Sequence, residues 1–141
     1  MPGLVDDLQG ATVILYAAPM MEVEFDDGNI LDRNFQLKII REMSEWYTYL
    51  DGAKQVILVQ EPRSRAHEAG GGRYWLDEER HRAWNRVLSV VAAVHPVGTC
   101  LVDYEAYHAT QPENRPDGSH MEGQGAVDAA RWIINQCPAG E

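Results

Sequence analysis

The chain has 141 residues, a length that favours one globular domain with a substantial core. Its formal net charge is −10 and it contains no basic cluster, which argues against nucleic acid or an anionic membrane surface as a partner. It lacks an apolar run of about 18 residues and a basic segment followed by an apolar one, so we expect no membrane insertion and no signal peptide. These absences predict a cytoplasmic protein, or an extracytoplasmic one if the chain is a fragment of a larger protein.

Short apolar runs alternate with helical patterns along the chain. Two runs, residues 11–16 and 55–59, are apolar and rich in β-branched residues, as in strands buried on both faces. Residues 99–103 form a third predicted strand. The helical patterns place apolar residues three and four apart and cover residues 34–50, 77–94 and 123–136. The first helix is expected to bury Ile39, Met43 and Trp46 on one face.

This β-α-β-α-β-α order predicts an α/β fold, a three-layer parallel sheet built from at least three βα units. The connections from helix to strand are short, whereas the three from strand to helix are long and rich in Pro, Gly and charged residues. In a parallel sheet these long connections meet at the carboxyl edge of the strands, where ligands bind. We therefore expect the functional site at that edge.

The last long connection carries the residues most suggestive of chemistry. Asp117 and His120 lie three residues apart, just before the last predicted helix. An aspartate can hold an imidazole in one tautomer and stabilise its charged form, as in a nucleophilic triad. The structural alternative is that Asp117 starts a turn, Ser119 caps the helix and His120 is an ordinary loop histidine.

The segment from Arg115 to Gly125, leading into a helix with Ala, Trp and Ile, resembles the last conserved block of the SGNH (GDSL-type) hydrolases, which carries the catalytic D-x-x-H. The order of elements extends the resemblance over most of the chain. It is closest in character to the SGNH-like domains of bacterial acyltransferases. The resemblance implies a flavodoxin-like sheet without a cofactor and ester hydrolysis or acyl transfer, often on a carbohydrate. In that scheme His120 is the general base and Asp117 orients it.

The family's nucleophile block has no counterpart in this chain. No Gly-Asp-Ser sequence occurs, and the usual oxyanion-hole glycine and asparagine have no clear equivalents. Ser44 and Ser89 fall within predicted helices, while Ser119 adjoins His120 too closely for a productive contact. Ser64, just after a predicted strand, is the only candidate substitute.

The resemblance therefore implies a single domain, residues 1–141, that lacks the N-terminal strands of the family. The chain could be a fragment, a half-domain completed by another chain, or a pseudoenzyme that binds without catalysing. An unpaired sheet edge invites pairing, so we expect a homo-oligomer or a partner chain that covers this edge. A non-catalytic binding or interaction module remains the alternative function.

Two further patterns leave alternatives open. Cys100 and Cys137 lack metal-site or redox spacing, so buried free thiols are expected, with a disulfide as the alternative. Carboxylates and imidazoles in the last long connection could together hold a metal ion, but no compact ligand spacing supports this, and we expect no metal. The residues concerned are Asp103, Glu105, His108, Asp117 and His120.

Overall fold

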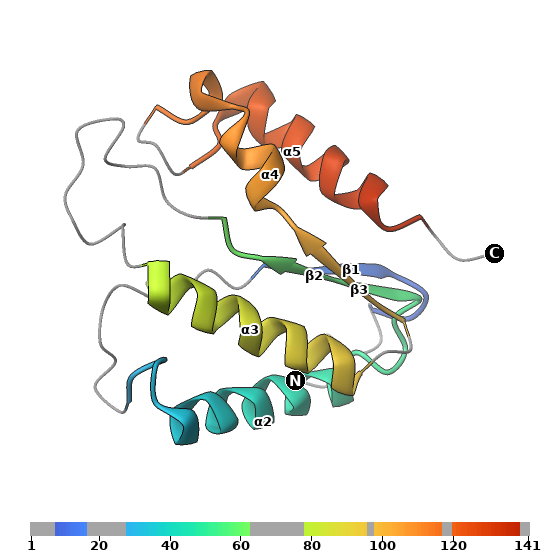
Figure 1. Cartoon of the computed structure of the whole chain (residues 1–141). Helices are drawn as coiled ribbons and strands as arrows, with labels where there is room; N and C mark the ends of the chain where they lie inside the picture. The colour runs from blue at the N-terminus through green and yellow to red at the C-terminus, as the bar shows by residue number, and fades with distance from the viewer. Residues whose placement is uncertain (1–7, 17–27, 63–77, 96–97, 117–119, 139–141) are drawn as a thin grey trace.

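The computed structural model describes residues 8–16, 28–62, 78–95, 98–116 and 120–138. In these residues the chain forms three strands, four α-helices and a 3₁₀ helix (Figure 1). They follow the order β1 (Thr12–Tyr16), α2 (Arg33–Tyr49), β2 (Gln55–Gln60), α3 (Glu78–Val94), β3 (Thr99–Asp103), α4 (Glu105–Ala109), η3 (Pro112–Asn114) and α5 (Gly123–Gln136). None of the described helices is long and apolar enough to cross a membrane.

The three strands form one parallel sheet in the order β1-β2-β3, which confirms the predicted α/β class. The register aligns Ile14 with Ile57, and Ile57 with Cys100. Helices α2 and α3 cover one face of the sheet, and α4 and α5 lie on the other (Figure 1). Since all strands run the same way, Tyr16, Gln60 and Asp103 end them at a common carboxyl edge.

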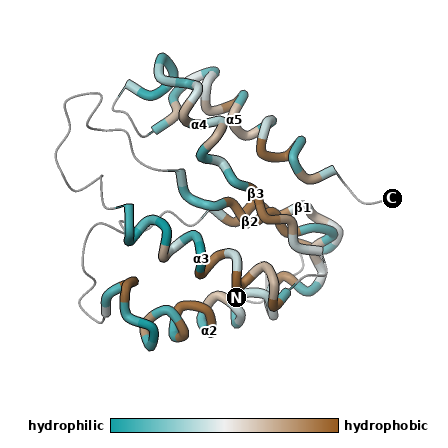
Figure 2. The backbone as a smooth tube through the Cα atoms, viewed as in Figure 1, coloured by the Kyte–Doolittle hydropathy of each residue, from teal (hydrophilic) through white to brown (hydrophobic). Residues whose placement is uncertain are grey.

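The central strand, β2, lies between two clusters of buried apolar side chains, and Figure 2 shows the hydrophobic residues of the sheet in brown. Side chains alternate along β2, so Leu58 packs toward α2 and α3, whereas Ile57 and Val59 pack toward α5. All three side chains are fully buried, and each contributes about 1.5–3 kcal/mol to folding through its removal from water. The prediction of a strand covered on both faces is confirmed for β2.

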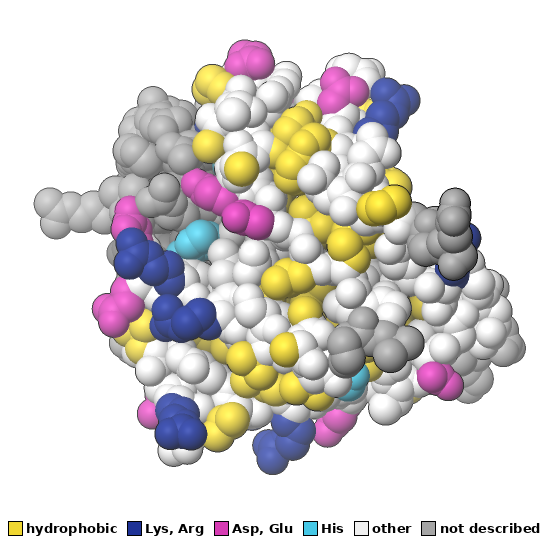
Figure 3. Space-filling model, turned by 45° about the vertical axis from the view of Figure 1, so that its right-hand side comes forward, with side chains coloured by type: hydrophobic (Ala, Val, Ile, Leu, Met, Phe, Trp, Pro, Cys, Tyr) yellow, Lys and Arg dark blue, Asp and Glu magenta, His cyan; other side chains and the backbone are white. Residues whose placement is uncertain are grey.

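The same prediction is wrong for β1. Its Leu15 packs toward α2 and α3, but Ile14 and Tyr16, which point to the α5 face, are 39% and 51% exposed. The reason is that α5 packs over β2 and β3 and leaves the β1 part of this face open. Figure 3 shows a band of hydrophobic side chains across the face of the molecule that is drawn there.

The helix predictions agree with the structure except in two places. Helix α2 begins after Asp32, whose carboxylate accepts a hydrogen bond from the Phe35 N–H (3.0 Å). Trp46, which was expected on the buried face of α2, is 48% exposed, because the helix buries a narrower stripe around Phe35 and Met43. The segment after β3, expected to be a loop, contains α4 and η3, which are too short to show a helical apolar period.

Cys100 and Cys137 form a disulfide. The expectation of buried free thiols is therefore wrong, and the alternative of a disulfide is confirmed. The bond joins β3 to the residue that ends α5. The two Cα atoms lie 6.0 Å apart, which is an ordinary separation for a disulfide. The bond therefore fixes the end of α5 to the sheet.

Candidate functional site

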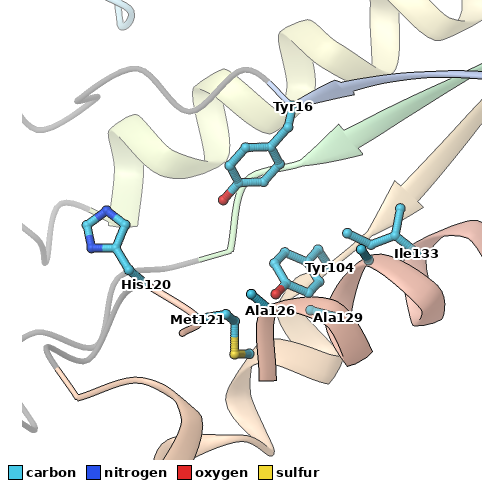
Figure 4. A pocket seen from close by; sticks show the side chains of 8 residues that line it. Tyr16, Tyr104, His120, Met121, Ala126, Ala129 and Ile133 are labelled. Atoms are coloured by element: carbon cyan, nitrogen blue, oxygen red, sulfur yellow. The ribbon is translucent and has the colours of Figure 1, made fainter. Parts of the chain in front are cut away.

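A pocket of about 340 Å³ opens at the carboxyl edge, between the end of β1 and the start of α5 (Figure 4). Tyr16 is the last residue of β1 and Tyr104 directly follows β3, so the parallel sheet brings both to this edge. The flank of α5 supplies small apolar side chains. The lining consists of Tyr16, Tyr104, His120, Met121, Ala126, Ala129, Ala130 and Ile133.

Tyr104 is held in an aromatic cluster below the pocket. Its ring is 5% exposed and lies 6.4 Å from Tyr16, 6.0 Å from Tyr107 and 6.2 Å from Trp132, measured between ring centroids. Tyr107 in turn stacks on Trp132 of α5 at 4.9 Å. Because these rings come from β1, α4 and α5, the cluster fixes the pocket wall to three separate elements.

Both tyrosine hydroxyls stay protonated over the physiological range. Burial raises the pKa of Tyr104 to about 12; Tyr107 adds to this rise, and the Arg115 guanidinium opposes it. Although half of Tyr16 is exposed, burial also raises its pKa, and the nearby Glu61 carboxylate raises it further. Figure 4 shows both hydroxyls pointing toward the side of the pocket where His120 and Met121 lie. The pocket therefore offers phenolic hydrogen-bond donors beside an imidazole.

The end of β2 beside this pocket is anchored to α3. The Asn85 side chain accepts a hydrogen bond from the Glu61 N–H (3.0 Å) and donates one to the Glu61 carbonyl (3.0 Å). The His81 Nε2 atom lies 2.6 Å from the same carbonyl oxygen. Ser89 accepts from the Gln60 side chain (3.0 Å), so this serine has a structural partner. These contacts fix Glu61, and with it the negative charge beside Tyr16.

The raised pKa of Tyr104 predicts a loss of stability in alkali. In the unfolded chain a tyrosine ionises near pH 10, whereas folded Tyr104 keeps its proton to about pH 12. The contribution of protonated Tyr104 to the free energy of unfolding is fully present below pH 10. It is lost as the pH rises toward 12, because in that range the unfolded state releases the proton and the folded state keeps it. Urea unfolding at pH 8, 10 and 11 should show a shallower decline for Tyr104→Phe than for wild type. Equal declines in the two proteins would contradict this assignment.

Of the predicted catalytic pair, His120 lies at the pocket, exposed, on the segment that leads into α5. Asp117 lies outside the described residues, as do Ser64 and Ser119. Ser44 and Ser89 are in α2 and α3, as expected, and neither lines the pocket. The pairing of an acid with His120 therefore stays a prediction.

The alternative of a metal site finds no support in the described part of the chain. No group of three His, Cys, Asp or Glu side chains there could hold a metal ion. The Asp103 carboxylate instead accepts a hydrogen bond from the Glu105 N–H (3.0 Å) at the start of α4. His108 is almost completely buried beside Tyr104, with 5.6 Å between the ring centroids.

The sequence pattern did not predict Tyr16, Tyr104 or the alanines of α5 as site residues. A signal for the tyrosines was present, because each stands at the carboxyl end of a predicted strand. The alanines at positions 126 and 130 are one helical turn apart and carry no chemical signature. Their role depends on which flank of α5 faces β1, and only the fold determines that.

Comparison with known protein families, with curated proteins and with solved structures finds no match to this chain.

Proposed function

We propose that this chain carries the acid–base part of an SGNH-type site for ester hydrolysis or acyl transfer. The observation that carries the proposal is that His120 lines an apolar pocket at the carboxyl edge of the parallel sheet. An imidazole in that place can accept the proton of an attacking hydroxyl group and return it to the leaving group. The flavodoxin-like assignment of the sheet and the orienting role of Asp117 are parts of the same proposal.

The nucleophile in this proposal is not Ser44 or Ser89, since neither lines the pocket. A serine of the loops, a serine from another chain, or a water molecule would have to attack the ester. Loss of a proper nucleophile removes several orders of magnitude of rate. We therefore expect the chain alone to be nearly inactive, with at most a weak esterase activity.

A binding module is the second candidate function. The observation that favours it is that neither Ser44 nor Ser89 lines the pocket. Binding needs the pocket and its hydrogen-bond donors, but it needs no nucleophile. The two candidates differ in whether His120 contributes to turnover. A small uncharged ester, or the acylated hydroxyl of a carbohydrate, is the ligand class in both.

Hydrolysis of p-nitrophenyl butyrate tests the catalytic proposal. The purified chain should hydrolyse this ester above the protein-free rate, and His120→Ala should lower the rate by about tenfold or more, because a general base has been removed. His95→Ala is the matched control, since His95 lies at the opposite edge of the sheet, beside Tyr47. Equal rates for wild type and His120→Ala would reject the catalytic proposal and leave the binding module.

We also propose that β1 pairs with β1 of a second copy of the chain. In the described residues β1 has a strand neighbour on one side only, and its five residues carry no charge that would oppose pairing. By contrast, the other edge strand, β3, ends in Asp103. The open face of β1 carries Ile14, and Ile134 of α5 is 46% exposed. An antiparallel pair would bury apolar surface without bringing net charge into the contact.

Sedimentation measures this association directly. Wild type should sediment as a dimer at micromolar concentration, and Ile14→Lys should shift it to the monomer, because a lysine on an edge strand blocks pairing. Leu37→Lys places the same charge at an exposed apolar position on α2 and should leave the dimer intact. A wild-type chain that is monomeric at every concentration tested would contradict the proposal.

The compartment is the last part of the proposal. Disulfides persist mainly in oxidising compartments and are rare in the cytosol. The bond between Cys100 and Cys137 therefore favours an extracytoplasmic location over the cytoplasmic one expected from the sequence.

A further inference from the structure

We propose that the pocket takes a short, straight, uncharged acyl group, whose carbonyl oxygen accepts a hydrogen bond from Tyr104 and whose hydrocarbon chain lies along Ala126 and Ala130. This inference rests on the proposed function, because that function is the reason for expecting an acyl group. It adds the chemical class of the ligand, the limit on its length and the residues that set both. It assigns no step of bond making or breaking to Tyr104. In this proposal Tyr104 binds the ligand, and the two alanines determine specificity.

The alanines form a smooth wall beside the open face of β1. Ala126 and Ala130 lie four residues apart on the same flank of α5, and both line the pocket. Ala129 and Ile133 close its inner side and are buried. A cavity of about 340 Å³ is near the lower end for small-molecule sites, so it limits the size of the ligand that it can hold.

The Tyr104 hydroxyl supplies the polar end of the site. Its side chain is more than nine-tenths buried, and Figure 4 shows the hydroxyl pointing into the pocket. Within the part of the chain that the structure describes, neither a backbone group nor a side chain accepts a hydrogen bond from this hydroxyl. A hydroxyl that faces an open pocket in this way forms its hydrogen bond with water or with a ligand oxygen. Because it stays protonated, it acts as a donor toward a carbonyl group.

The charge on the Tyr16 side of the pocket favours a neutral ligand there. The Glu61 carboxylate lies close enough to Tyr16 to raise its pKa, and the whole chain carries a net charge of −10. A free carboxylate beside Tyr16 would meet the negative potential of Glu61, whereas the Arg115 guanidinium acts on the Tyr104 hydroxyl with the opposite sign. An ester or amide carbonyl offers the same acceptor without the charge.

Calorimetric titration with the N-methyl amides of straight-chain acids, from acetic to octanoic, tests the inference without any hydrolysis. We expect the affinity to rise about fourfold with each methylene group until the pocket is full. Ala130→Leu should move the break in this series to shorter chains and should lower the affinity for the longest ligands by about tenfold. Ala93→Leu makes the same change at an exposed position of α3 and should leave the series unchanged.

Tyr104→Phe keeps the ring and removes only the hydroxyl group. It should weaken every member of the series by about three- to tenfold, the worth of one hydrogen bond. Tyr107→Phe is the matched control, since Tyr107 belongs to the aromatic cluster but does not line the pocket.

The outcomes of these titrations separate the inference from the proposed function. An affinity that is independent of chain length, tighter binding of the matched carboxylates, or a series unaffected by Ala130→Leu would overturn the inference. Chain-length-dependent binding by a protein without esterase activity would support the inference while the catalytic proposal fails.

Discussion

Reduction of the Cys100–Cys137 disulfide should lower the free energy of unfolding by about 3–4 kcal/mol, the loop-closure contribution of a bond between residues 37 apart. The bond restricts the unfolded chain more than the folded one, because α5 already packs on β3 through Val102 and Ile133. Urea unfolding with and without a reductant measures the difference. Since a domain of this size is only marginally stable, the reduced chain should be partly unfolded at 37 °C.

The double variant Cys100→Ala/Cys137→Ala provides the control for this prediction. It should show the stability of the reduced chain, and a reductant should have no further effect on it. An unchanged unfolding midpoint of wild type after complete reduction, verified by thiol counting, would contradict the stabilising role of the bond.

Tyr104→Ala should lower the free energy of unfolding by about 3 kcal/mol or more, as expected for the loss of a buried aromatic ring. Tyr104 is the ring that joins β1, α4 and α5, through its contacts with Tyr16, Tyr107 and Trp132. Its loss leaves a cavity below the pocket that the disulfide-linked α5 cannot readily close. Urea unfolding monitored by circular dichroism measures this effect.

Two variants bracket this prediction. Tyr104→Phe retains the ring and should stay within about 1 kcal/mol of wild type. Tyr49→Ala removes an exposed tyrosine from α2 and should change the stability by less than about 0.5 kcal/mol. If Tyr104→Ala were no worse than Tyr49→Ala, the aromatic cluster would not be a structural element of the fold.

The sequence was sufficient to predict the elements whose boundaries carry strong local signals. The bounds predicted for β3 and α5 agree with the structure. Gly98, which directly precedes the strand, and Gly123, the first residue of the helix, both have a positive φ that favours glycine. Helix α4 was missed because five residues are too few to show a 3.6-residue period. The exposure of Ile14 was missed because a continuous apolar run does not reveal that a helix covers only part of a sheet face.

The location of the candidate site could be predicted from the sequence, but most of the residues that form it could not. Long connections at the carboxyl edge pointed to the region where His120 lies. The disulfide depends on a Cα–Cα distance of 6.0 Å between β3 and the end of α5, which no spacing along the chain encodes. Likewise, the donor role of Tyr104 follows from its burial in the packed structure.

Amide NMR of the labelled chain titrated with N-methylbutyramide tests most directly whether the carboxyl edge carries the functional site. We expect the largest shifts at Tyr16, Tyr104, His120 and Ala126, which line the pocket. Shifts centred instead on the hollow at the opposite edge, lined by Tyr47 and His95 among others, would contradict it. The same conclusion would follow if saturating ligand produced no shifts at all.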